Sequence, residues 1–418
     1  MVKPKVIFAN RVYWPDESAT AQLLTDLAPA LVQRGREVHV IAGGTGPAEH
    51  AGVTVHRTGG DNSVRGLRAR VASYWRYLRA ARGIIGRLAR PGDCIVIKTD
   101  PPMLAAALTG PARARGANVV QWVQDIYPEI AWQHAGAAWK PLLLPLRCAR
   151  DRAWRTSAFC VPVGDDMAKL VCARGVAPER VRVLPNWAPR EMEALPSSQE
   201  VKALRTASGW DGKFVAAYSG NLGRVHEFAT VLGAAAELRR RPEFRFVFIG
   251  TGARHGEVAA AVRRDDLENV QLLPARPRAQ LAASLGSVDA HVVTLLPGFE
   301  SLVHPSKVAG ALAAGKPIAF VGPPQSALAG FLRTEGCGAV FAPGEAQALA
   351  ATLAEWHSKP ERHAALAQAA RTAYEKHFRF AHVLAAWERL LDEAGGGDRN
   401  DIASTGARAL SDSRSAVP

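Results

Sequence analysis

The stretch KVIFANRVYWPDESATAQLLTDLAPALVQRGREVHVIA, residues 5–42, decides the fold class of this chain. The apolar runs at 5–9 and 38–42 have the length and composition of buried strands. Between them, leucines recur at helical spacing, and Gly35 ends the helix they predict. A strand, a helix and a second strand with short connections form a right-handed parallel unit. This stretch therefore predicts an α/β domain built on a parallel sheet.

The same succession returns in the second half of the chain. Phe214–Ser219 restarts the apolar pattern, and a helix near 227–239 follows it. A chain of 418 residues is too long for one ordinary core, so we expect two α/β domains. The polar sequence after Pro189, to about residue 212, predicts the connection between them. Further strands are predicted at 94–98, 119–123, 158–163, 181–184, 244–249, 270–273 and 291–296.

A second informative stretch is PGFESLVHPSKVAGALAAGKPIA, residues 297–319. Its small apolar residues 306–314 predict a helix that begins just after a proline. A lysine in the first turn suits a diphosphate, because backbone N–H groups, the helix dipole and a point charge then face one spot. An ordinary strand–loop–helix joint is the alternative. We expect the diphosphate to be bound by Lys307 and the backbone N–H groups near Leu302 and Val303, with Glu300 beside it accepting hydrogen bonds from sugar hydroxyls.

Several motifs together resemble glycosyltransferase family 4, in the branch that builds bacterial surface polysaccharides and includes colanic-acid and O-antigen fucosamine or N-acetylglucosamine transferases. The resemblance covers nearly the whole chain, to about residue 394. It implies the GT-B fold, in which two Rossmann-like domains face each other across a cleft, and transfer with retention of anomeric configuration. Besides the Glu300 segment, the motifs are YWPDESATAQ at 13–22, WVQDIYPE at 122–129, LPNW at 184–187, YSGNLG at 218–223 and FIGTG at 248–252.

The resemblance also divides the chain. It implies an acceptor-binding domain at 1–189 and a nucleotide-sugar-binding domain at 190–379. The helix expected at 380–394 would return to the first domain, as the terminal helix does in GT-B enzymes. The tail at 395–418 is a mixture of glycine, serine, arginine and alanine that cannot bury a core, and we expect it to be disordered.

The first loop of the second domain is expected to line the wall opposite Lys307. There, the small Gly220 and Gly223 would let the backbone approach the donor; a plain strand-to-helix turn is the alternative reading. Many family members have an arginine after the first glycine and a lysine a few residues on. This chain has Asn221 and, at about the lysine's place, His226. We expect Asn221 to contact the donor and Arg224 to be the alternative cation.

Two further features concern the nucleoside part of the donor. The family's second glutamate, which contacts the donor ribose, is replaced here by Gly310, so ribose recognition must be built differently. Gly250 and Gly252 follow a predicted strand end, where open α/β sheets bind ligands. Arg276 lies in the loop that resembles the family's base-binding segment. The resemblance implies uracil, and thymine or guanine stays open.

The acceptor side is assigned to the first domain. Asp125 follows a predicted strand and would point into the cleft, where it positions the acceptor or stabilises positive charge; a helix N-cap before Pro128 is the alternative. Because the leaving phosphate can itself take the proton in a retaining transfer, a strong base is not required. The other acceptor candidates are Glu129, one turn further, and Asp16, Glu17 and Thr20 of the first loop.

No D-x-D carboxylate pair occurs in the chain, so we expect neither a metal nor any other cofactor. The net charge of +14 indicates an anionic partner. We expect a nucleotide-sugar donor and a polyprenyl-diphosphate-linked sugar acceptor; nucleic acid is not expected, because no recognition helix or zinc signature accompanies the charge. Five scattered cysteines without a C-x-x-C pair fit a reducing cytoplasm.

Residues 65–90 predict a basic amphipathic helix with eight arginines and interleaved aromatic residues. Such a helix suits an anionic membrane surface, and an ordinary packed helix with a solvated face is the alternative. We therefore expect a cytoplasmic protein, peripheral on the inner face of the plasma membrane. As the function, we expect transfer of a UDP-linked HexNAc or deoxy-HexNAc in exopolysaccharide, capsule or O-antigen synthesis. A UDP-sugar epimerase and a non-catalytic nucleotide-sugar-binding protein are the alternatives.

Overall fold

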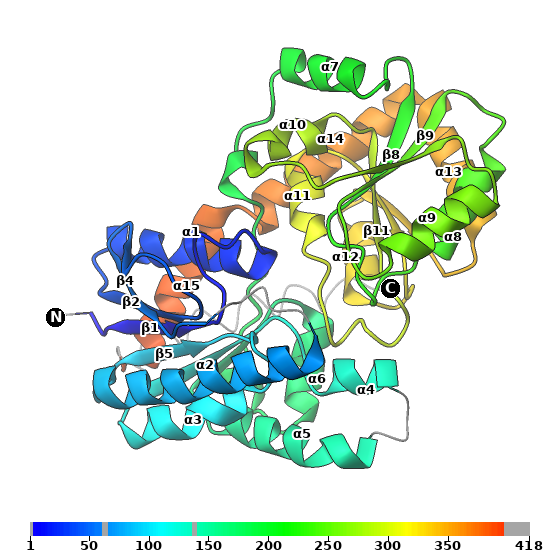
Figure 1. Cartoon of the computed structure of the whole chain (residues 1–418). Helices are drawn as coiled ribbons and strands as arrows, with labels where there is room; N and C mark the ends of the chain where they lie inside the picture. Colours follow the sequence, from blue (N-terminus) through cyan, green and yellow to red (C-terminus); the bar gives the residue numbers. More distant parts are fainter. Residues whose placement is uncertain (1–2, 61–65, 136–139, 397–418) are drawn as a thin grey trace, which may run out of the picture.

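A computed structural model describes residues 3–60, 66–135 and 140–396. It contains two α/β domains, joined by the segment after Pro185 and by a helix that crosses back (Figure 1). Both the expected α/β class and the expected pair of parallel-sheet domains are confirmed. Arg65 at the start of the predicted basic helix, and nearly all of the tail expected to be disordered, lie outside the described residues.

The first domain has a seven-stranded sheet in the order β3-β4-β2-β1-β5-β6-β7, parallel except for β3. Its strands are β1 (Val6–Ala9), β2 (Val38–Ala42), β3 (Glu49–His50), β4 (Val53–Arg57), β5 (Cys94–Ile97), β6 (Asn118–Val123) and β7 (Phe159–Pro162). Its helices are α1 (Ala19–Gln33), α2 (Leu67–Leu88), α3 (Leu104–Ala114), α4 (Glu129–Ala135), α5 (Lys140–Arg155) and α6 (Asp165–Ala173).

The second domain has a six-stranded parallel sheet in the order β10-β9-β8-β11-β12-β13. The strands are β8 (Phe214–Ser219), β9 (Phe244–Ile249), β10 (Val270–Leu273), β11 (Ala290–Thr294), β12 (Ile318–Val321) and β13 (Gly338–Phe341). The helices are α7 (Ser198–Ala207), α8 (Ala229–Glu237), α9 (His255–Arg264), α10 (Leu281–Gly286), α11 (Lys307–Ala313), α12 (Ala327–Thr334), α13 (Ala346–Ser358) and α14 (Pro360–His377).

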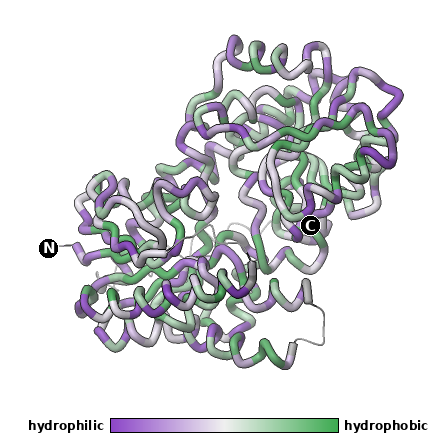
Figure 2. Tube along the Cα trace, viewed as in Figure 1, coloured by the Kyte–Doolittle hydropathy of each residue, from purple (hydrophilic) through white to green (hydrophobic). Residues whose placement is uncertain are grey.

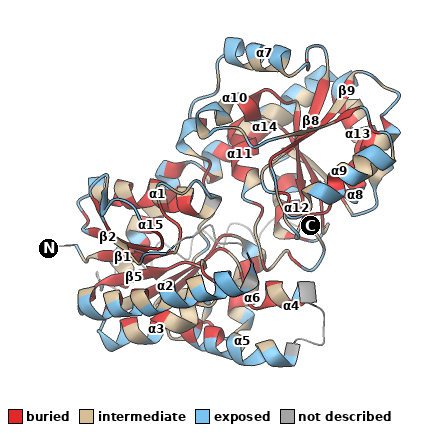
Figure 3. Ribbon diagram, viewed as in Figure 1, coloured by how far each residue is buried: buried red, intermediate tan, exposed pale blue. Residues whose placement is uncertain are grey.

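Burial explains why these segments are strands. The central strands of both sheets are mostly apolar and are buried along their whole length, as parallel strands between helical layers must be (Figures 2 and 3). The helices expose one face to solvent, most extensively α2 and α7 (Figure 3). The loops that follow the carboxyl ends of the strands therefore carry the polar groups available for chemistry.

The last helix, α15 (Phe380–Ala394), leaves the second domain and packs on the first (Figure 1). Its Trp387 ring lies 4.8 Å from the ring of Trp122 in β6, measured between centroids. Its Asp392 accepts a 2.6 Å hydrogen bond from Arg36, whose side chain is fully buried. The helix therefore ties the end of the chain to the sheet of the first domain.

Two expectations about local structure were wrong. Residues 181–184 form no strand: they make a single parallel bridge between Val181 and Cys160. Arg182 N–H donates to Cys160 and Leu184 N–H donates to Pro162, but Pro162 has no N–H with which to return a bond, so no ladder forms. The polar segment expected as a linker contains α7, whose N-terminus is closed by a capping box between Ser197 and Glu200.

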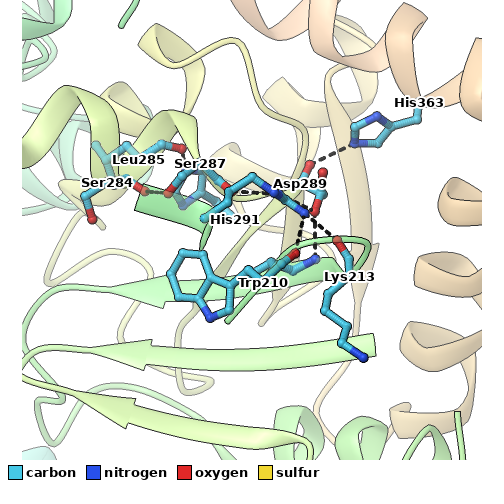
Figure 4. A network of polar contacts seen from close by, with 10 residues as sticks. Trp210, Lys213, Ser284, Leu285, Ser287, Asp289, His291 and His363 are labelled. Carbon is cyan, nitrogen blue, oxygen red and sulfur yellow. Dashed lines mark hydrogen bonds and ion pairs between the residues drawn. The ribbon is translucent and has the colours of Figure 1, made fainter. Parts of the chain in front are cut away.

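A polar network holds α7 to the second domain at the edge opposite the cleft (Figure 4). Arg205 of α7 donates to the backbone oxygens of Ser287 and Trp210 and pairs with Asp289 at 3.1 Å. Asp289 also accepts from the backbone N–H of Val215, and its own carbonyl accepts from His363. These bonds lie at the amino ends of the strands, so they stabilise the domain and leave the carboxyl edge for the site.

Candidate active site

A cavity of about 270 Å³ lies between the two domains, at the carboxyl ends of their sheets. The second domain contributes the end of β8, the start of α11 and part of α10, while the first contributes α1 and the connection. Ligands bind at this edge of open α/β sheets. The residues that matter here are Gln22, Asp26, Asn186, Trp187, Gly220, Asn221, Ser306, Lys307 and Gly310.

Lys307 begins α11 and projects toward the β8 loop. Its Nζ lies 3.3 Å from His226 Nε2 and 4.7 Å from the centroid of the Tyr218 ring. A Cβ on Gly220 would come within 2.9 Å of Lys307 Cε, and the φ of Gly220 is +130°. Glycine is therefore required at position 220 to admit the lysine side chain.

The protonation of His226 follows from its partners. Its Nδ1 lies 2.7 Å from the carbonyl oxygen of Thr294, so Nδ1 carries the proton and donates it. Burial, and then the charge of Lys307, lower the pKa of His226 to about 3, so the ring is neutral. Nε2 is then free to accept from the Lys307 ammonium. The histidine thus orients the lysine without adding charge.

Burial lowers the pKa of Lys307 to about 8. Among residues 3–60, 66–135 and 140–396, no carboxylate forms an ion pair with Lys307. The ammonium uses one proton on His226 and lies over the ring of Tyr218, whose hydroxyl donates to the backbone of Asn221. A half-buried cation without a carboxylate partner is suited to an incoming anion.

The other expected glycines allow close contacts between the loops that follow β8 and β9. A Cβ on Gly250 would lie 2.3 Å from the carbonyl oxygen of Gly220, and one on Gly252 would lie 2.5 Å from that of Leu222. Both glycines therefore let the β9 loop pack on the β8 loop. A Cβ on Gly223 would meet the side chain of Asn221 at 3.2 Å. Glycine is therefore needed at these positions, as the sequence indicated, but the atoms that approach these glycines belong to the protein itself.

The remaining donor candidates lie at different distances from the cavity. Asn221 lines it, and Arg224 on the same loop is exposed. Arg276 donates to the hydroxyl of Ser208 at 3.2 Å and does not line the cavity. Gly310 does line it, and a Cβ there would meet Leu285 at 3.1 Å, so the wall at this point is apolar.

Two expectations about the 297–319 stretch need correction. The N–H groups of Leu302 and Val303 both donate to the carbonyl oxygen of Phe299, at 2.9 and 3.1 Å, so neither is free for a diphosphate. Glu300 accepts from the N–H of Gly298 and lines a separate cavity of about 210 Å³. Glu300 and Lys307 therefore do not face one spot, because the segment between them turns toward the first domain.

Asp125 lies where that segment meets the first domain. It pairs with Val303 in an antiparallel bridge, and Ile126 N–H donates to Leu302 at 2.9 Å. Burial and the charge of Asp100 raise the pKa of Asp125 to about 6, against the opposing effect of Lys98. This carboxyl group is therefore held at the interface between the domains, with an ionisation that changes near neutral pH.

Glu129 is not available to an acceptor, contrary to expectation. It is 3% exposed and accepts two hydrogen bonds from Arg150, at 2.7 and 2.9 Å. Arg174 approaches the same carboxylate at 3.4 Å. This pairing could not be predicted, because Arg150 and Arg174 are distant from Glu129 in the chain. Glu129 is an internal counter-ion of the first domain.

Asp16 and Glu17 lie in the loop before α1, whereas Thr20, expected in the same loop, lies in the first turn of α1. Asp16 accepts from the N–H of Ser18, and Glu17 is exposed. The carbonyl oxygen of Thr20 accepts a 2.9 Å hydrogen bond from Lys98, a residue that sequence reasoning did not single out. Lys98, which directly follows β5, therefore anchors the first turn of α1.

Sequence reasoning also missed the polar contact that joins the domains across the cavity. Arg278 of the second domain donates to both oxygens of Glu191, at 2.7 and 3.1 Å, and lies 3.3 Å from Asp26 of α1. Asp26 accepts from the indole N–H of Trp187, and burial raises its pKa. An aspartate inside the helical run of 19–33 was the available signal, since it lies on the buried side.

Two family models match consecutive parts of the chain. Residues 19–187 match a glycosyl transferase 4-like domain, and residues 200–373 match the glycosyl transferases group 1 domain. The chain is 28% identical over 269 residues to WbjE of Pseudomonas aeruginosa, described as a probable glycosyltransferase. That match covers 64% of this chain and 66% of WbjE, slightly less than two-thirds of the relative.

Solved structures share the fold. HepE of Anabaena in complex with UDP superimposes with a TM-score of 0.70 at 15% identity, over 93% of this chain and 100% of that chain. WaaG, a glycosyltransferase involved in lipopolysaccharide biosynthesis, gives 0.70 at 16% identity, over 94% and 100%. The two family models, which match consecutive parts of the chain, show that it belongs to the glycosyltransferases with a 4-like domain and a group 1 domain, and the solved structures show that it has the GT-B fold.

Proposed function

We propose that this protein transfers a sugar, with retention of configuration, from a UDP-linked HexNAc or deoxy-HexNAc to a lipid-linked acceptor in surface-polysaccharide synthesis. The observation that carries the proposal is Lys307, a half-buried cation without a carboxylate partner among the described residues, at the wall of an interdomain cavity. HepE, which has the same fold, is known in complexes with UDP and with UDP-glucose.

Sugar transfer from a nucleoside diphosphate requires positive charge near the leaving phosphate. As the bond from the sugar to the nucleoside diphosphate breaks, negative charge grows on the leaving phosphate. A preorganised ammonium in a site with little water stabilises that charge most as the bond breaks, which lowers the barrier. Lys307 has its orientation fixed by His226 and Tyr218, so it need not reorganise during the reaction.

On the acceptor side, we assign to Asp125 the role of orienting the incoming hydroxyl. The hydroxyl must reach the face of the sugar from which the phosphate departs, and that phosphate can take the proton. Asp125 then acts by holding the hydroxyl and by stabilising positive charge on the sugar ring. Its position at the bridge with Val303 lies where the two domains meet, as such a role requires.

A direct assay tests the proposal. The protein is incubated with a panel of UDP-sugars, with and without a polyprenyl-diphosphate-linked sugar, and UDP release and products are followed by mass spectrometry. Acceptor-dependent UDP release supports the proposal, and the anomeric configuration of the product, read by NMR, tests retention. Conversion of the donor without acceptor would instead indicate an epimerase, and binding without turnover a non-catalytic protein.

The lipid-linked acceptor implies docking on a membrane, which we place on the α2–α3–α5 side of the first domain. Trp75 of α2 is 69% exposed and Leu142 of α5 is 67% exposed, and both helices pack against α3. Exposed arginines accompany the tryptophan along α2. No helix in the part of the chain that the structure describes is long and apolar enough to cross a bilayer. An amphipathic, basic surface of this kind suits anionic lipid head groups.

Co-sedimentation with anionic vesicles tests the docking. Each cation near the surface contributes on the order of 1 kcal/mol, and salt screens that attraction. Binding should therefore fall steeply from low to high salt, and again in the variant Arg68→Gln, Arg76→Gln, Arg79→Gln. A matched variant with three glutamines on α9 and α14, at Arg263, Arg264 and Arg362, should bind as the wild type does. If the wild type ignores the vesicles at low salt, α2 is only a packed helix.

A further inference from the structure

The first domain contains a buried lysine that the proposed reaction has not used. Lys98 follows β5 and is 1% exposed. Its Nζ donates to the carbonyl oxygen of Thr20 at 2.9 Å and lies 3.9 Å from the centroid of the Trp122 ring. Burying an ammonium is costly unless opposite charge or hydrogen bonds compensate it, and one carbonyl and one ring compensate only in part.

The rest of the compensation comes from two carboxylates at the same edge of the sheet. Lys98 lines a small cavity of about 20 Å³ together with Asp125 and Tyr127. Asp100, two residues beyond Lys98, interacts electrostatically with both Lys98 and Asp125. Lys98 therefore lies in a cluster whose other members include the group assigned to the acceptor.

Charged and titratable groups from several neighbouring elements surround Lys98, Asp100 and Asp125. Asp100 pairs with Arg11 of the β1 loop at 3.3 Å, and Asp16 of the first loop adds negative charge near it. Arg150 of α5 lines the cavity and is bound to Glu129 and Asp151. The groups of α2 that act on this cluster are Arg70, Tyr74 and Tyr77.

Lys98 and Asp125 influence each other's charge. Burial lowers the pKa of Lys98 to about 7, against the opposing effect of Asp100 and Asp125. Lys98 in turn opposes the burial that raises the pKa of Asp125 to about 6. Burial, with the charge of Asp125, raises the pKa of Tyr127 to about 12, so that phenol stays protonated. The lysine and the aspartate are thus the two members of the cavity whose charges change near neutral pH.

We propose that Lys98 is a positioning residue that acts through Asp125, stabilising its carboxylate at the interface between the domains while anchoring the first turn of α1 through Thr20. The inference rests on the proposed function, in which Asp125 orients the acceptor. Lys98 itself touches neither substrate, because it lies beneath Trp122 and α1. Its effect on turnover is carried by the charge of a neighbouring group, so it depends on pH.

The first test is the pH profile of kcat/KM for acceptor in Lys98→Met and Lys98→Arg. Losing the cation raises the pKa of Asp125, so the acid limb in Lys98→Met should move to higher pH by ~1 unit or more, with activity returning as the pH rises. Lys98→Arg keeps the cation and should keep the limb near its wild-type position. Lys202→Met, on exposed α7, is the control. An equal loss at every pH in Lys98→Met would overturn the proposal.

The second test needs no turnover and no folded Lys98→Met. In protein labelled with ¹³C at lysine Cε, the Lys98 signal is titrated in the wild type and in Asp125→Asn. Because the coupling is reciprocal, losing the carboxylate should lower the Lys98 midpoint by about as much as losing Lys98 raises that of Asp125. An unchanged midpoint would sink the Lys98 proposal. Absence of acceptor-dependent UDP release in the wild type would instead sink the proposed function, so the two failures are distinct.

Discussion

Each domain has a lysine over an aromatic ring near the interface between the domains, but the charges around the two lysines differ. In the first domain, Lys98 lies 3.9 Å from the Trp122 ring and is offset by Asp100 and Asp125. In the second, Lys307 lies 4.7 Å from the Tyr218 ring beside a neutral histidine. Two carboxylates act electrostatically on the first cation, whereas burial alone shifts the pKa of the second, whose charge a ligand can neutralise.

This difference between the two lysines indicates which domain binds the charged part of the substrate. The first domain neutralises its buried charges internally, through Arg150 with Glu129, Arg11 with Asp100, and Lys98 with its carboxylates. Its face then suits a neutral acceptor hydroxyl. The second domain leaves one positive charge uncompensated at the cavity wall, and its face suits a diphosphate.

Breaking the internal neutralisation of the first domain should have the largest effect. Glu129→Ala leaves Arg150 with Asp151 alone, and Arg174 without its counter-ion. We expect the free energy of unfolding to fall by about 3 kcal/mol, at the lower end for a broken buried pair because Asp151 remains. Urea denaturation followed by circular dichroism measures it. Glu375→Ala, which breaks an exposed pair with Arg371, is the control and should change stability far less.

Removing the uncompensated charge of the second domain should instead affect turnover. Lys307→Ala should lower kcat by ~10²–10³-fold, as expected when one preorganised electrostatic donor is lost, while the thermal midpoint stays near that of the wild type. Lys202→Ala, on the exposed face of α7, serves as the matched control. Turnover close to normal at saturating donor would remove Lys307 from the site and with it the asymmetry of the two walls.

The fold was largely readable from the sequence, because buried parallel strands leave nearly continuous apolar runs such as 38–42 and 214–219. The short edge strand β3 and its neighbour β4 carry a weaker pattern and were not predicted. At 181–184 the apolar run was real, and only the missing N–H of Pro162 on the neighbouring strand prevented pairing. That constraint belongs to the partner strand, so the run itself cannot reveal it.

The site was readable where it is built by the loops that follow two adjacent strands of one sheet. Gly220, Asn221 and Lys307 do line one cavity, since loops after adjacent parallel strands meet at one edge. The separation of Glu300 from Lys307 was not readable, because it depends on how the 297–305 segment contacts the other domain. The engagement of Glu129 by Arg150, and the place of Lys98 beneath Thr20, likewise depend on contacts between residues distant in the chain.

Loosening the contact between the walls should have a smaller effect than altering either one. Arg278→Met removes the bonds to Glu191 and the ion pair with Asp26 across the cavity. We expect the donor KM to rise roughly fivefold, the equivalent of about 1 kcal/mol for a partly exposed ion pair, with kcat little changed. Steady-state kinetics with Arg263→Met of α9 as control measures it. A fall in kcat with KM unchanged would show that the contact serves the chemical step and not closure.

The smallest effect should come from a chelator. If the charge of the leaving diphosphate is met by Lys307, no divalent cation is needed, and the chain has no D-x-D pair with which to hold one. Turnover measured after dialysis against EDTA should therefore match the untreated enzyme within error, and added magnesium should not raise it. Activity abolished by EDTA and restored by magnesium would mean that the metal supplies the missing charge. Lys307 would then share its role, and Lys307→Ala should lose less activity in magnesium than without it.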